Sequence, residues 1–315
     1  MSKNYVIAAL YCFVDIKAVA ELRNDVLNKF ENTSMRGTLL VAAEGINGTV
    51  AGTRAEVNNL LALLKSKIDL TNIEYKESFA SYNPFLRFKV KLKQEIVTIA
   101  RDEVNPCELV GEYVEPEAWN DLISDPEVMV LDTRNDYEID IGTFKGAINP
   151  KTTNFREFPQ YVNDNLQQHK QRKVAMFCTG GIRCEKASSY MLNAGFDKVY
   201  HLKGGILAYL AKIPKHQSLW QGECFVFDER VALDHNLDPG SFDQCYGCRH
   251  PITATDKESE HYVKGISCPK CYADTTLEQK SRFASRQSQI DIAKARGTKH
   301  LGVKVMMQQD KQSAS

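Results

Sequence analysis

The sequence predicts an α/β protein in three parts: an α+β module, a parallel α/β domain, and a cysteine-rich region followed by a basic helix. Apolar runs of strand length alternate with helical segments through the first two thirds of the chain. Two closely spaced cysteine pairs follow near the C-terminal end. At about 150 residues per domain, the 315 residues suffice for two or three separate cores.

The composition is that of an ordinary globular protein. Hydrophobic residues make up 43% and charged residues 25%, and 40 Lys+Arg balance 40 Asp+Glu. Extensive disorder is therefore excluded, and nucleic-acid binding would depend on local basic clusters. The longest apolar run, Tyr5–Val14, has ten residues, about half of a bilayer span, so no membrane segment is expected.

The compartment predicted from the sequence is a reducing cytoplasm. A single Lys precedes the apolar run Tyr5–Val14, and no small-residue cleavage site follows it, which argues against a secretory signal. The nine cysteines are an odd number. In a cytoplasmic protein, paired cysteines more often bind metal or perform chemistry than form disulfides.

The N-terminal part alternates strands and helices. Periodicity predicts two helices, Ile16–Phe30 and Arg54–Lys67. It predicts four strands: Tyr5–Val14, Thr38–Ala43, Thr49–Ala51 and Arg87–Leu92. This β-α-β-β-α-β order is the ferredoxin-like pattern, and the segment Glu44–Gly48 is expected to form a tight turn within it.

The last predicted strand carries a basic stripe. Its alternation places four cations on one face and the apolar residues on the other: Arg87, Lys89, Lys91 and Lys93. Such a stripe is either a solvated sheet face or a surface that follows the phosphates of a nucleic acid, and the spacing alone does not decide between them.

The middle part has the pattern of a parallel sheet. Apolar strands are predicted at Val128–Leu131, Lys173–Phe177 and Val199–Leu202, with helices between them, of which Glu185–Ala194 is the clearest. The changes of pattern divide the chain into the α+β module at 1–97, a linker at 98–120, the parallel domain at 121–220 and the C-terminal region at 221–315.

A cysteine loop follows the second of these strands and is the candidate catalytic site. It consists of Cys178 and the anion-stabilising residues Thr179, Gly180, Gly181, Ile182 and Arg183. Two glycines let the loop curl so that its N–H groups point inward, and the next helix adds its positive end. This setting favours a thiolate at Cys178. The alternatives are an inert buried cysteine and a cysteine phosphatase, whose loop has five residues between Cys and Arg where this chain has four.

The C-terminal cysteines have zinc-site spacing. Cys245 and Cys248 form one C-x2-C pair, Cys268 and Cys271 form the other, and 19 residues separate the pairs. Two such turns supply four sulfurs for a structural zinc with no open position. Unmetallated thiols, or His250 or His261 in place of a cysteine, remain alternatives.

A basic segment follows the cysteines. Glu278–Arg296 is predicted to be helical, and the surrounding cations suggest an RNA-binding surface together with the strand stripe. Its candidate RNA-binding residues are Arg282, Arg286 and Arg296. The final residues, Gln308–Ser315, have the composition of a disordered tail.

The middle domain resembles a rhodanese domain. The resemblance is carried by the Cys178 loop together with four further motifs: Asp132-Thr133-Arg134, Tyr137-Glu138, Gly146-Ala147-Ile148-Asn149 and Leu202–Ile206. The segment Gly142–Ala147 departs from the Gly-His-Ile-Pro-Gly-Ala of many rhodaneses. Asp132, Arg134 and Glu138 are expected to form framework salt bridges and not to act as catalysts.

The chain from about residue 3 to 303 also resembles the bacterial tRNA wobble-uridine hydroxylases. The motifs are Glu44–Gly48, Arg87–Lys93, the loop from Cys178 to Cys184, and the tail from Arg282 to Gly302. The resemblance implies an enzyme that converts the wobble uridine of the tRNA anticodon loop to 5-hydroxyuridine, with molecular oxygen as co-substrate. No flavin or NAD fingerprint is present in the sequence.

Two chemistries for Cys178 follow from this interpretation: its thiolate adds to C6 of the uracil ring, or it carries a persulfide. Cys184 either resolves an oxidised Cys178 or is a packing residue. The alternative functions are a sulfurtransferase that carries sulfane sulfur on Cys178 and a non-catalytic RNA-binding scaffold.

Overall fold

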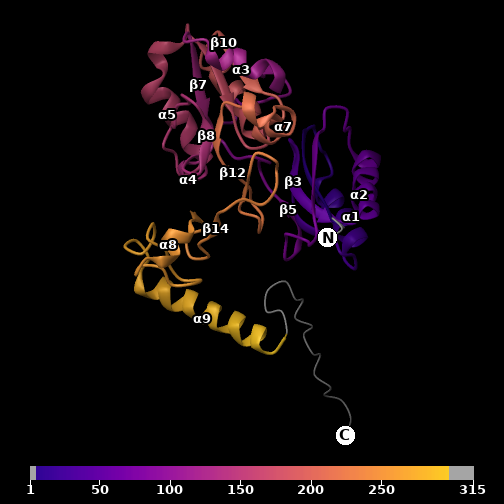
Figure 1. Cartoon of the computed structure of the whole chain (residues 1–315). Helices are drawn as coiled ribbons and strands as arrows, with labels where there is room; N and C mark the ends of the chain where they lie inside the picture. The colour runs from indigo at the N-terminus through magenta and orange to yellow at the C-terminus, as the bar shows by residue number, and fades with distance from the viewer. Residues whose placement is uncertain (1–4, 298–315) are drawn as a thin grey trace. The chain divides into compact units, whose positions relative to one another are not determined.

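The computed structural model describes residues 5–297, and its chain forms two compact units. Unit 1 consists of Met1–Gln244 with His250–Ala254, and unit 2 of Cys245–Arg249 with Thr255–Ser315. Figure 1 labels their helices and strands. The expected tail, Gln308–Ser315, and the motif residues His300–Gly302 lie outside the described part of the chain.

The N-terminal domain of unit 1 has the predicted ferredoxin-like fold. Its helices are α1 (Val19–Phe30) and α2 (Arg54–Lys67), and its five strands form a sheet of order β4-β1-β3-β2-β5. The strands are β1 (Tyr5–Phe13), β2 (Arg36–Ala42), β3 (Gly45–Gly52), β4 (Glu74–Ala80) and β5 (Phe88–Leu92).

Two details of this domain differ from the sequence prediction. The strand that completes the ferredoxin-like order is β4, beside β1, whereas Arg87–Leu92 corresponds to β5, an additional strand that pairs in parallel with β2. The sequence prediction missed β4 because it is a charged segment, with three charged residues among its first four (Glu74, Lys76 and Glu77). The expected turn Glu44–Gly48 is also shorter, because Gly45 already begins β3.

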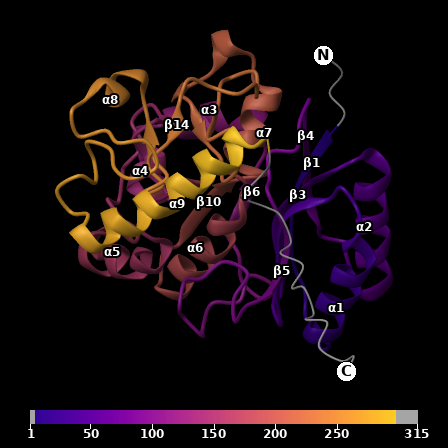
Figure 2. The same cartoon turned by 90° about the horizontal axis from the view of Figure 1, so that it is seen from below.

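The sheet of this domain has one covered and one open face. Alternate residues of β1 enter the core beneath the helices (Val6, Ala8, Leu10 and Cys12). Figure 2 shows α1 and α2 together on that side of the sheet. Because side chains alternate along a strand, Ile7, Ala9 and Tyr11 lie on the opposite face, which no helix of this domain covers.

The middle domain of unit 1 is a parallel sheet of order β6-β10-β9-β7, as the strand pattern predicts. These strands are Glu112–Val114, Lys198–Leu202, Lys173–Phe177 and Val128–Asp132, respectively. Residues 112–120, which the sequence assigned to a linker, form β6 and the start of α3 (Pro116–Ser124). The remaining elements up to residue 217 are α4 (Asp136–Ile139), β8 (Gly142–Phe144), α5 (Phe158–Asn165), α6 (Ile182–Asn193), α7 (Gly205–Lys212) and 3-10 turns at Phe155–Glu157, Gln167–His169 and Lys215–Gln217.

Both faces of the parallel sheet are buried. On one face Met129, Val174 and Met176 pack with residues of α5 and α6, and on the other Val130, Ala175 and Phe177 pack with residues of α3 and α7. Burial on both faces explains why these strands read as continuous apolar runs.

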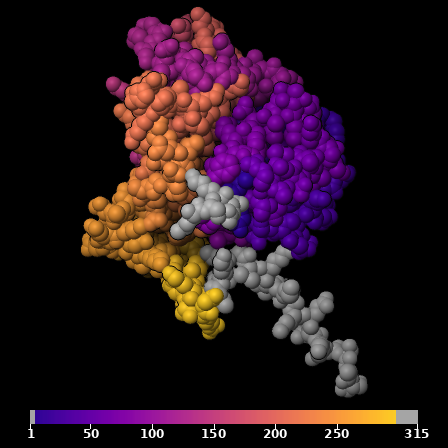
Figure 3. Space-filling view, turned by 45° about the vertical axis from the view of Figure 1, so that its right-hand side comes forward, coloured from indigo at the N-terminus to yellow at the C-terminus, as the bar shows by residue number. Residues whose placement is uncertain are grey.

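The segment after α7 returns to the N-terminal domain. Its strands are β11 (Trp220–Gly222), β12 (Cys224–Phe225), β13 (Ala232–Leu233), β14 (Asp243–Gln244) and β15 (Pro251–Ile252). The guanidinium of Arg230 donates to Ser78 Oγ of β4 at 2.9 Å, and Glu229 N–H donates to the Pro84 carbonyl at 3.2 Å. Figure 3 shows the orange surface of this segment against the indigo and purple N-terminal domain.

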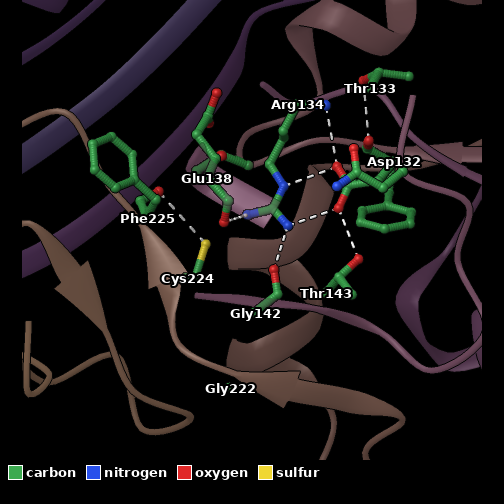
Figure 4. Close-up of polar contacts among 12 residues, drawn as sticks. Asp132, Thr133, Arg134, Glu138, Gly142, Thr143, Gly222, Cys224 and Phe225 are labelled. Carbon is green, nitrogen blue, oxygen red and sulfur yellow. Dashed lines mark hydrogen bonds and ion pairs between the residues drawn. The ribbon is translucent and has the colours of Figure 1, made fainter. Parts of the chain in front are cut away.

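A buried ion pair organises the edge of the middle domain (Figure 4). The Arg134 guanidinium donates to both carboxylate oxygens of Asp132, at 2.9 and 2.7 Å, and both side chains are fully buried. Arg134 also donates to the carbonyls of Gly142 and Glu138, and Thr143 Oγ1 donates to Asp132. The two buried charges are therefore paired with each other and hydrogen-bonded to further groups, as expected of a structural ion pair.

Unit 2 contains the four clustered cysteines and the basic helix that the sequence predicts. Its helix α9 (Leu277–Ala295) begins at a capping box. The Thr276 hydroxyl accepts from the N–H of Gln279, and the Gln279 side-chain oxygen accepts from the N–H of Thr276. The short helix α8 spans Ala254–Glu258, where the two units meet along the chain. Among residues 5–297, no helix combines the length and the apolar character required to cross a bilayer.

Candidate active site

The site is centred on Cys178, directly after β9 at the carboxyl end of the parallel sheet. The side chain is 1% exposed, and its Sγ accepts the backbone N–H of Gly181 at 3.1 Å. The helix α6 begins at Ile182, so its unpaired N–H groups face the sulfur. This is the local geometry that the glycine-containing loop predicts.

Two glycines make the loop possible. Gly181 has φ of +104°, a conformation that a residue with Cβ rarely adopts. Gly205, at the start of α7, approaches so closely that a Cβ there would lie 2.4 Å from the Cys178 carbonyl oxygen. This approach lets the N–H groups of Ile206 and Leu207 donate to the carbonyls of Cys178 and Thr179. The carbonyls are thus held away from the sulfur.

Arg183 is the cation of the loop, and Glu138 holds it in place. Its two terminal nitrogens donate to the two carboxylate oxygens of Glu138 at 2.7 and 2.8 Å. The Glu138 side chain is fully buried and that of Arg183 is 10% exposed. A weaker contact of 3.5 Å joins the guanidinium to Thr179 Oγ1. Glu138 therefore acts through Arg183, in agreement with the framework role expected for it.

The electrostatics of the loop favour a thiolate at Cys178. Burial by itself raises the pKa of this thiol, but the Cys184 thiol, the Arg183 charge and the backbone N–H groups of both residues lower it well below its usual value. For Cys184, burial and then the hydrogen bond to the Cys178 sulfur raise the pKa well above its usual value. The loop therefore favours ionisation of Cys178 over ionisation of Cys184.

Cys184 lies deeper in the fold than Cys178. Its side chain is fully buried within the middle-domain core, and its Sγ lies 3.5 Å from Thr133 Oγ1. Cys184 packs in the core and also hydrogen-bonds with the Cys178 sulfur, so a packing role and a resolving role are both compatible with its position.

A cavity of about 510 Å³ opens at Cys178, lined by residues of both domains of unit 1. Of the predicted loop residues, Cys178, Thr179, Gly180, Ile182 and Arg183 line it. The opposite wall is the open face of the N-terminal sheet, including Ala9, Tyr11 and Thr49, and the segment Val226–Asp228 closes one side. The sheet face left uncovered by α1 and α2 is thus the second wall of the site.

The sequence interpretation missed two polar residues that line the cavity, Tyr11 and Lys76, and a third, Glu185, that accepts the Tyr11 hydroxyl behind it. The Lys76 ammonium donates to the Gly180 carbonyl at 3.1 Å and lies 5.9 Å from the centre of the Tyr11 ring. Burial lowers the pKa of Lys76. The alternation along β1 places Tyr11 on the open face, but nothing in the sequence indicates which surface faces it.

The basic stripe lies on the same face of the N-terminal sheet as the cavity wall. Its residues Arg87, Lys89, Lys91 and Lys93 are all exposed. Strand pairing gives one cross-strand row of Lys89, Thr38, Thr49 and Ala9 and a second row of Lys91, Leu40, Asn47 and Tyr11. Directly paired residues share a face, so Lys89 and Lys91 lie two strand spacings, roughly 10 Å, from the cavity residues Thr49 and Asn47 of their rows.

The four C-terminal cysteines form a cluster that fits a metal ion. The sulfurs of Cys245, Cys248, Cys268 and Cys271 all lie within 4.8 Å of one another, with pairs at 3.8 and 4.0 Å. A tetrahedral zinc with Zn–S distances of about 2.3 Å requires S–S separations of about 3.8 Å. Neither histidine belongs to the cluster, because the His261 ring stacks on Tyr272 and the His250 ring packs on Tyr137. The four cysteines could therefore bind a metal such as zinc.

The three candidate RNA-binding arginines of the basic helix differ in what they contact. Arg286 donates to two backbone carbonyls, Tyr246 at 2.7 Å and Gly265 at 2.9 Å, and so joins α9 to the cysteine cluster. Arg282 lies over the Phe283 ring at 5.7 Å, and Arg296 follows the last residue of the helix. Of the three, Arg286 has a structural role within unit 2.

Two family descriptions match the chain. Residues 5–96 match the UPF0176 acylphosphatase-like domain, and residues 115–212 match the rhodanese-like domain. Both matches agree with the two folds of unit 1.

Three solved structures illustrate these similarities. A rhodanese-like domain from Anabaena sp. is 20% identical, with 36% of this chain and 80% of that chain covered and a TM-score of 0.30. A rhodanese-like domain protein from Staphylococcus aureus is 22% identical, with 31% and 90% covered and a TM-score of 0.26. An acylphosphatase from Coxiella burnetii is 18% identical, with 28% and 95% covered and a TM-score of 0.24. The chain therefore combines a UPF0176 acylphosphatase-like domain, which is ferredoxin-like in fold, with a rhodanese-like domain that fits a catalytic role centred on a cysteine.

Proposed function

We propose that this protein hydroxylates the wobble uridine of tRNA to 5-hydroxyuridine, with Cys178 as the catalytic residue. The observation that carries the proposal is the position of the Cys178 sulfur. It is an anion-stabilised sulfur at the end of a two-domain cavity of about 510 Å³, a volume that accommodates one extruded nucleotide. A lysine stripe continues along the same sheet face.

Electrostatic attraction holds the RNA phosphates, and the cavity holds the base. A single-stranded anticodon loop allows the uridine to leave its stack at low cost. Its phosphates follow the stripe that includes Lys89 and Lys91, while the base enters beside Cys178. Within unit 2 the cations Arg282 and Arg296 extend the basic surface of α9.

The thiolate of Cys178 adds to C6 of the uracil ring, and the C5–C6 π electrons move toward C5 and O4. The electron-rich C5 then reacts with oxygen, and loss of the C5 proton to solvent expels the thiolate from C6. The balance is uridine plus O2 plus two thiols, giving 5-hydroxyuridine, water and a disulfide. Molecular oxygen is the oxidant, and a thiol donor supplies the two electrons.

A second candidate function is sulfurtransfer through a persulfide on Cys178. It is favoured by the rhodanese-like domain and by the inward-facing N–H groups, which would stabilise a terminal sulfur as well as a thiolate. It predicts rapid formation of thiocyanate from thiosulfate and cyanide. A purely RNA-binding scaffold would need no anion-stabilised cysteine, and nothing in the site favours it.

The test is nucleoside mass spectrometry of tRNA from cells that lack the gene and express either the wild type or Cys178→Ser. We expect 5-hydroxyuridine with the wild type, its loss when oxygen is withheld, and its loss with Cys178→Ser. The matched control is Cys107→Ser, which changes an exposed cysteine that does not line the cavity. Retained 5-hydroxyuridine in Cys178→Ser cells would overturn the proposal.

A further inference from the structure

A buried carboxyl group stands behind the active-site cavity and is hydrogen-bonded by two tyrosines. Glu185, in the first turn of α6, is 4% exposed. Its carboxylate accepts the hydroxyl of Tyr11 at 2.9 Å and the hydroxyl of Tyr113 at 2.7 Å. Tyr11 comes from β1 of the N-terminal domain and Tyr113 from β6 of the middle domain. The carboxyl group is therefore held by hydroxyls from both domains.

Only one of these tyrosines reaches the reaction site. Tyr11 lines the cavity together with Cys178, whereas Tyr113 does not and is 44% exposed. The Tyr11 hydroxyl lies 2.9 Å from the position of a Cβ at Gly181, the residue whose N–H donates to the Cys178 sulfur. The hydroxyl is thus next to the loop that holds the reactive sulfur.

Glu185 changes its charge near neutral pH. Burial, together with the charges of Glu74 and Cys178, raises its pKa to about 7, against the lowering effect of the hydrogen bonds from Tyr113 and Tyr11. A cation nearby is Lys76, whose ammonium lies 3.4 Å from Glu74 and donates to the Gly180 carbonyl. A carboxyl group that is half protonated at neutral pH both donates and accepts a proton readily.

The protonation state of Glu185 decides where the hydrogen of Tyr11 points. When Glu185 is ionised, it is an acceptor only, and both tyrosine hydrogens are directed to it. When it is protonated, its own O–H can donate to the Tyr11 oxygen, and the single hydrogen of Tyr11 is then free to point into the cavity. The hydroxyl is thus a proton donor to a ligand only in the protonated state of Glu185.

We propose that Tyr11 is a catalytic acid of the Cys178 site and that Glu185 resupplies its proton. This inference rests on the proposed uridine chemistry. As the S–C6 bond forms, the C5–C6 π pair moves to O4, the Tyr11 proton passes to O4, and the Glu185 proton passes to the Tyr11 oxygen. When C5 bonds to oxygen, the C4 carbonyl re-forms, so the O4 proton returns to Tyr11 and the Tyr11 proton to Glu185. The peroxide oxygen takes a proton from solvent, and the C5 proton is released to solvent as the thiolate leaves, so no net proton is consumed.

The test uses the purified full chain, an anticodon stem-loop RNA, oxygen and a thiol reductant, with 5-hydroxyuridine measured across neutral pH. Tyr11→Phe should lower kcat by about 100-fold or more with little change in KM, the usual size of a general-acid effect. Tyr190→Phe is the matched control, because it removes a hydroxyl bonded to Pro159 and Asn163, away from the cavity. It should retain the wild-type rate.

The pH profile separates proton transfer from a structural role. Wild-type activity should decline as pH rises through the pKa of Glu185, because the active form is protonated. Tyr113→Phe removes a hydrogen bond that lowers this pKa, so its declining limb should move to higher pH. Glu185→Gln keeps a hydrogen-bond acceptor but cannot titrate, so the limb should disappear and kcat should be low at every pH.

The outcomes distinguish this inference from the proposed function. If the wild type forms 5-hydroxyuridine, Cys178→Ser does not, and Tyr11→Phe keeps the wild-type rate and pH profile, the acid role of Tyr11 is overturned and the proposed function stands. If the wild type forms none under any condition, the proposed function fails first. Iodoacetamide labelling of Cys178 in Tyr11→Phe checks that the loop is intact, and a loss of labelling would indicate a structural role for Tyr11 and overturn the proposal.

Discussion

Arg183 and Glu138 are joined by two parallel hydrogen bonds of 2.7 and 2.8 Å inside the rhodanese-like domain. The carboxylate is fully buried and the guanidinium nearly so. This geometry holds the positive charge of the cysteine loop in a single position, so that its effect on Cys178 does not depend on a mobile side chain.

Removal of Glu138 should strongly destabilise unit 1. Glu138→Ala leaves the Arg183 guanidinium buried without its carboxylate, and we expect the free energy of unfolding to fall by about 3–5 kcal/mol. Urea denaturation measures it. The control is Glu115→Ala, which removes the partner of Lys203 in an ion pair that is about half exposed, with an expected loss of at most about 1 kcal/mol. Equal losses in the two variants would contradict the bracing role of Glu138.

Cys178 should react as a thiolate at mildly acidic pH. Its pKa is lowered, so the ionised form persists as pH falls below the range in which an ordinary thiol ionises. Iodoacetamide labelling followed by peptide mass spectrometry measures the modification rate of each cysteine against pH. Cys107 is the internal reference, because burial and nearby carboxylates raise its pKa.

A change in the loop charge tests the cause of this shift. Arg183→Met removes a charge that lowers the pKa of Cys178, so the labelling midpoint should move to higher pH. An unchanged midpoint would mean that the N–H groups and the Cys184 thiol set the ionisation without the guanidinium.

Removal of the metal should destabilise the fold of unit 2. The four cysteine sulfurs have the spacing of a filled tetrahedral site, so a bound zinc would supply folding energy to a unit whose longest helix buries no residue of its own. We expect one zinc per chain by elemental analysis, its loss in Cys268→Ser, and faster proteolysis of unit 2 after chelation. A chain purified with no metal and unaltered by chelator would refute the assignment.

Two arginines of α9 should behave differently. Arg286→Ala removes two hydrogen bonds to backbone carbonyls beside the cysteine cluster, so it should weaken metal retention and increase proteolysis of unit 2. Arg282→Ala removes only a contact with the Phe283 ring and should leave metal retention unchanged. Identical behaviour of the two variants would contradict the structural role of Arg286.

The lysine stripe should control RNA affinity. Lys89→Glu with Lys91→Glu should weaken tRNA binding and reduce the slope of log affinity against log salt by about one for each lost phosphate contact. Filter binding at several salt concentrations measures both. The control with the same charge change per site is Lys65→Glu on α2, the helix that covers the opposite face of the sheet. A loss of affinity in the control alone would place the RNA elsewhere.

Some features of the site follow from short stretches of chain. The anion-stabilising geometry of Cys178 depends on the strand before it, the glycines beside it and the helix after it, all within about ten residues. The two C-x2-C pairs likewise have a spacing that predicts their cluster. The strands of the parallel sheet are recognisable because burial on both faces requires continuous apolar runs.

Other features escaped prediction because their signals are weak along the chain. The charged segment Glu74–Ala80 lacks the apolar alternation of a strand, yet it pairs with β1 and carries Lys76 to the cavity. Residues 112–120 have the composition of a linker, yet β6 within them joins the parallel sheet. An edge strand has fewer partners, and so its sequence is less constrained.

The curled loop at Cys178 and the C-terminal cysteine cluster could be predicted from the sequence, because each is encoded by neighbouring residues whose spacing sets their geometry. The residues that face Cys178 could not, because they depend on how the two domains pack. Tyr11 and Glu185 are 174 positions apart, and no local pattern links them. They meet because the open face of one domain's sheet packs against the carboxyl edge of the other's, and such packing depends on the complementarity of whole surfaces.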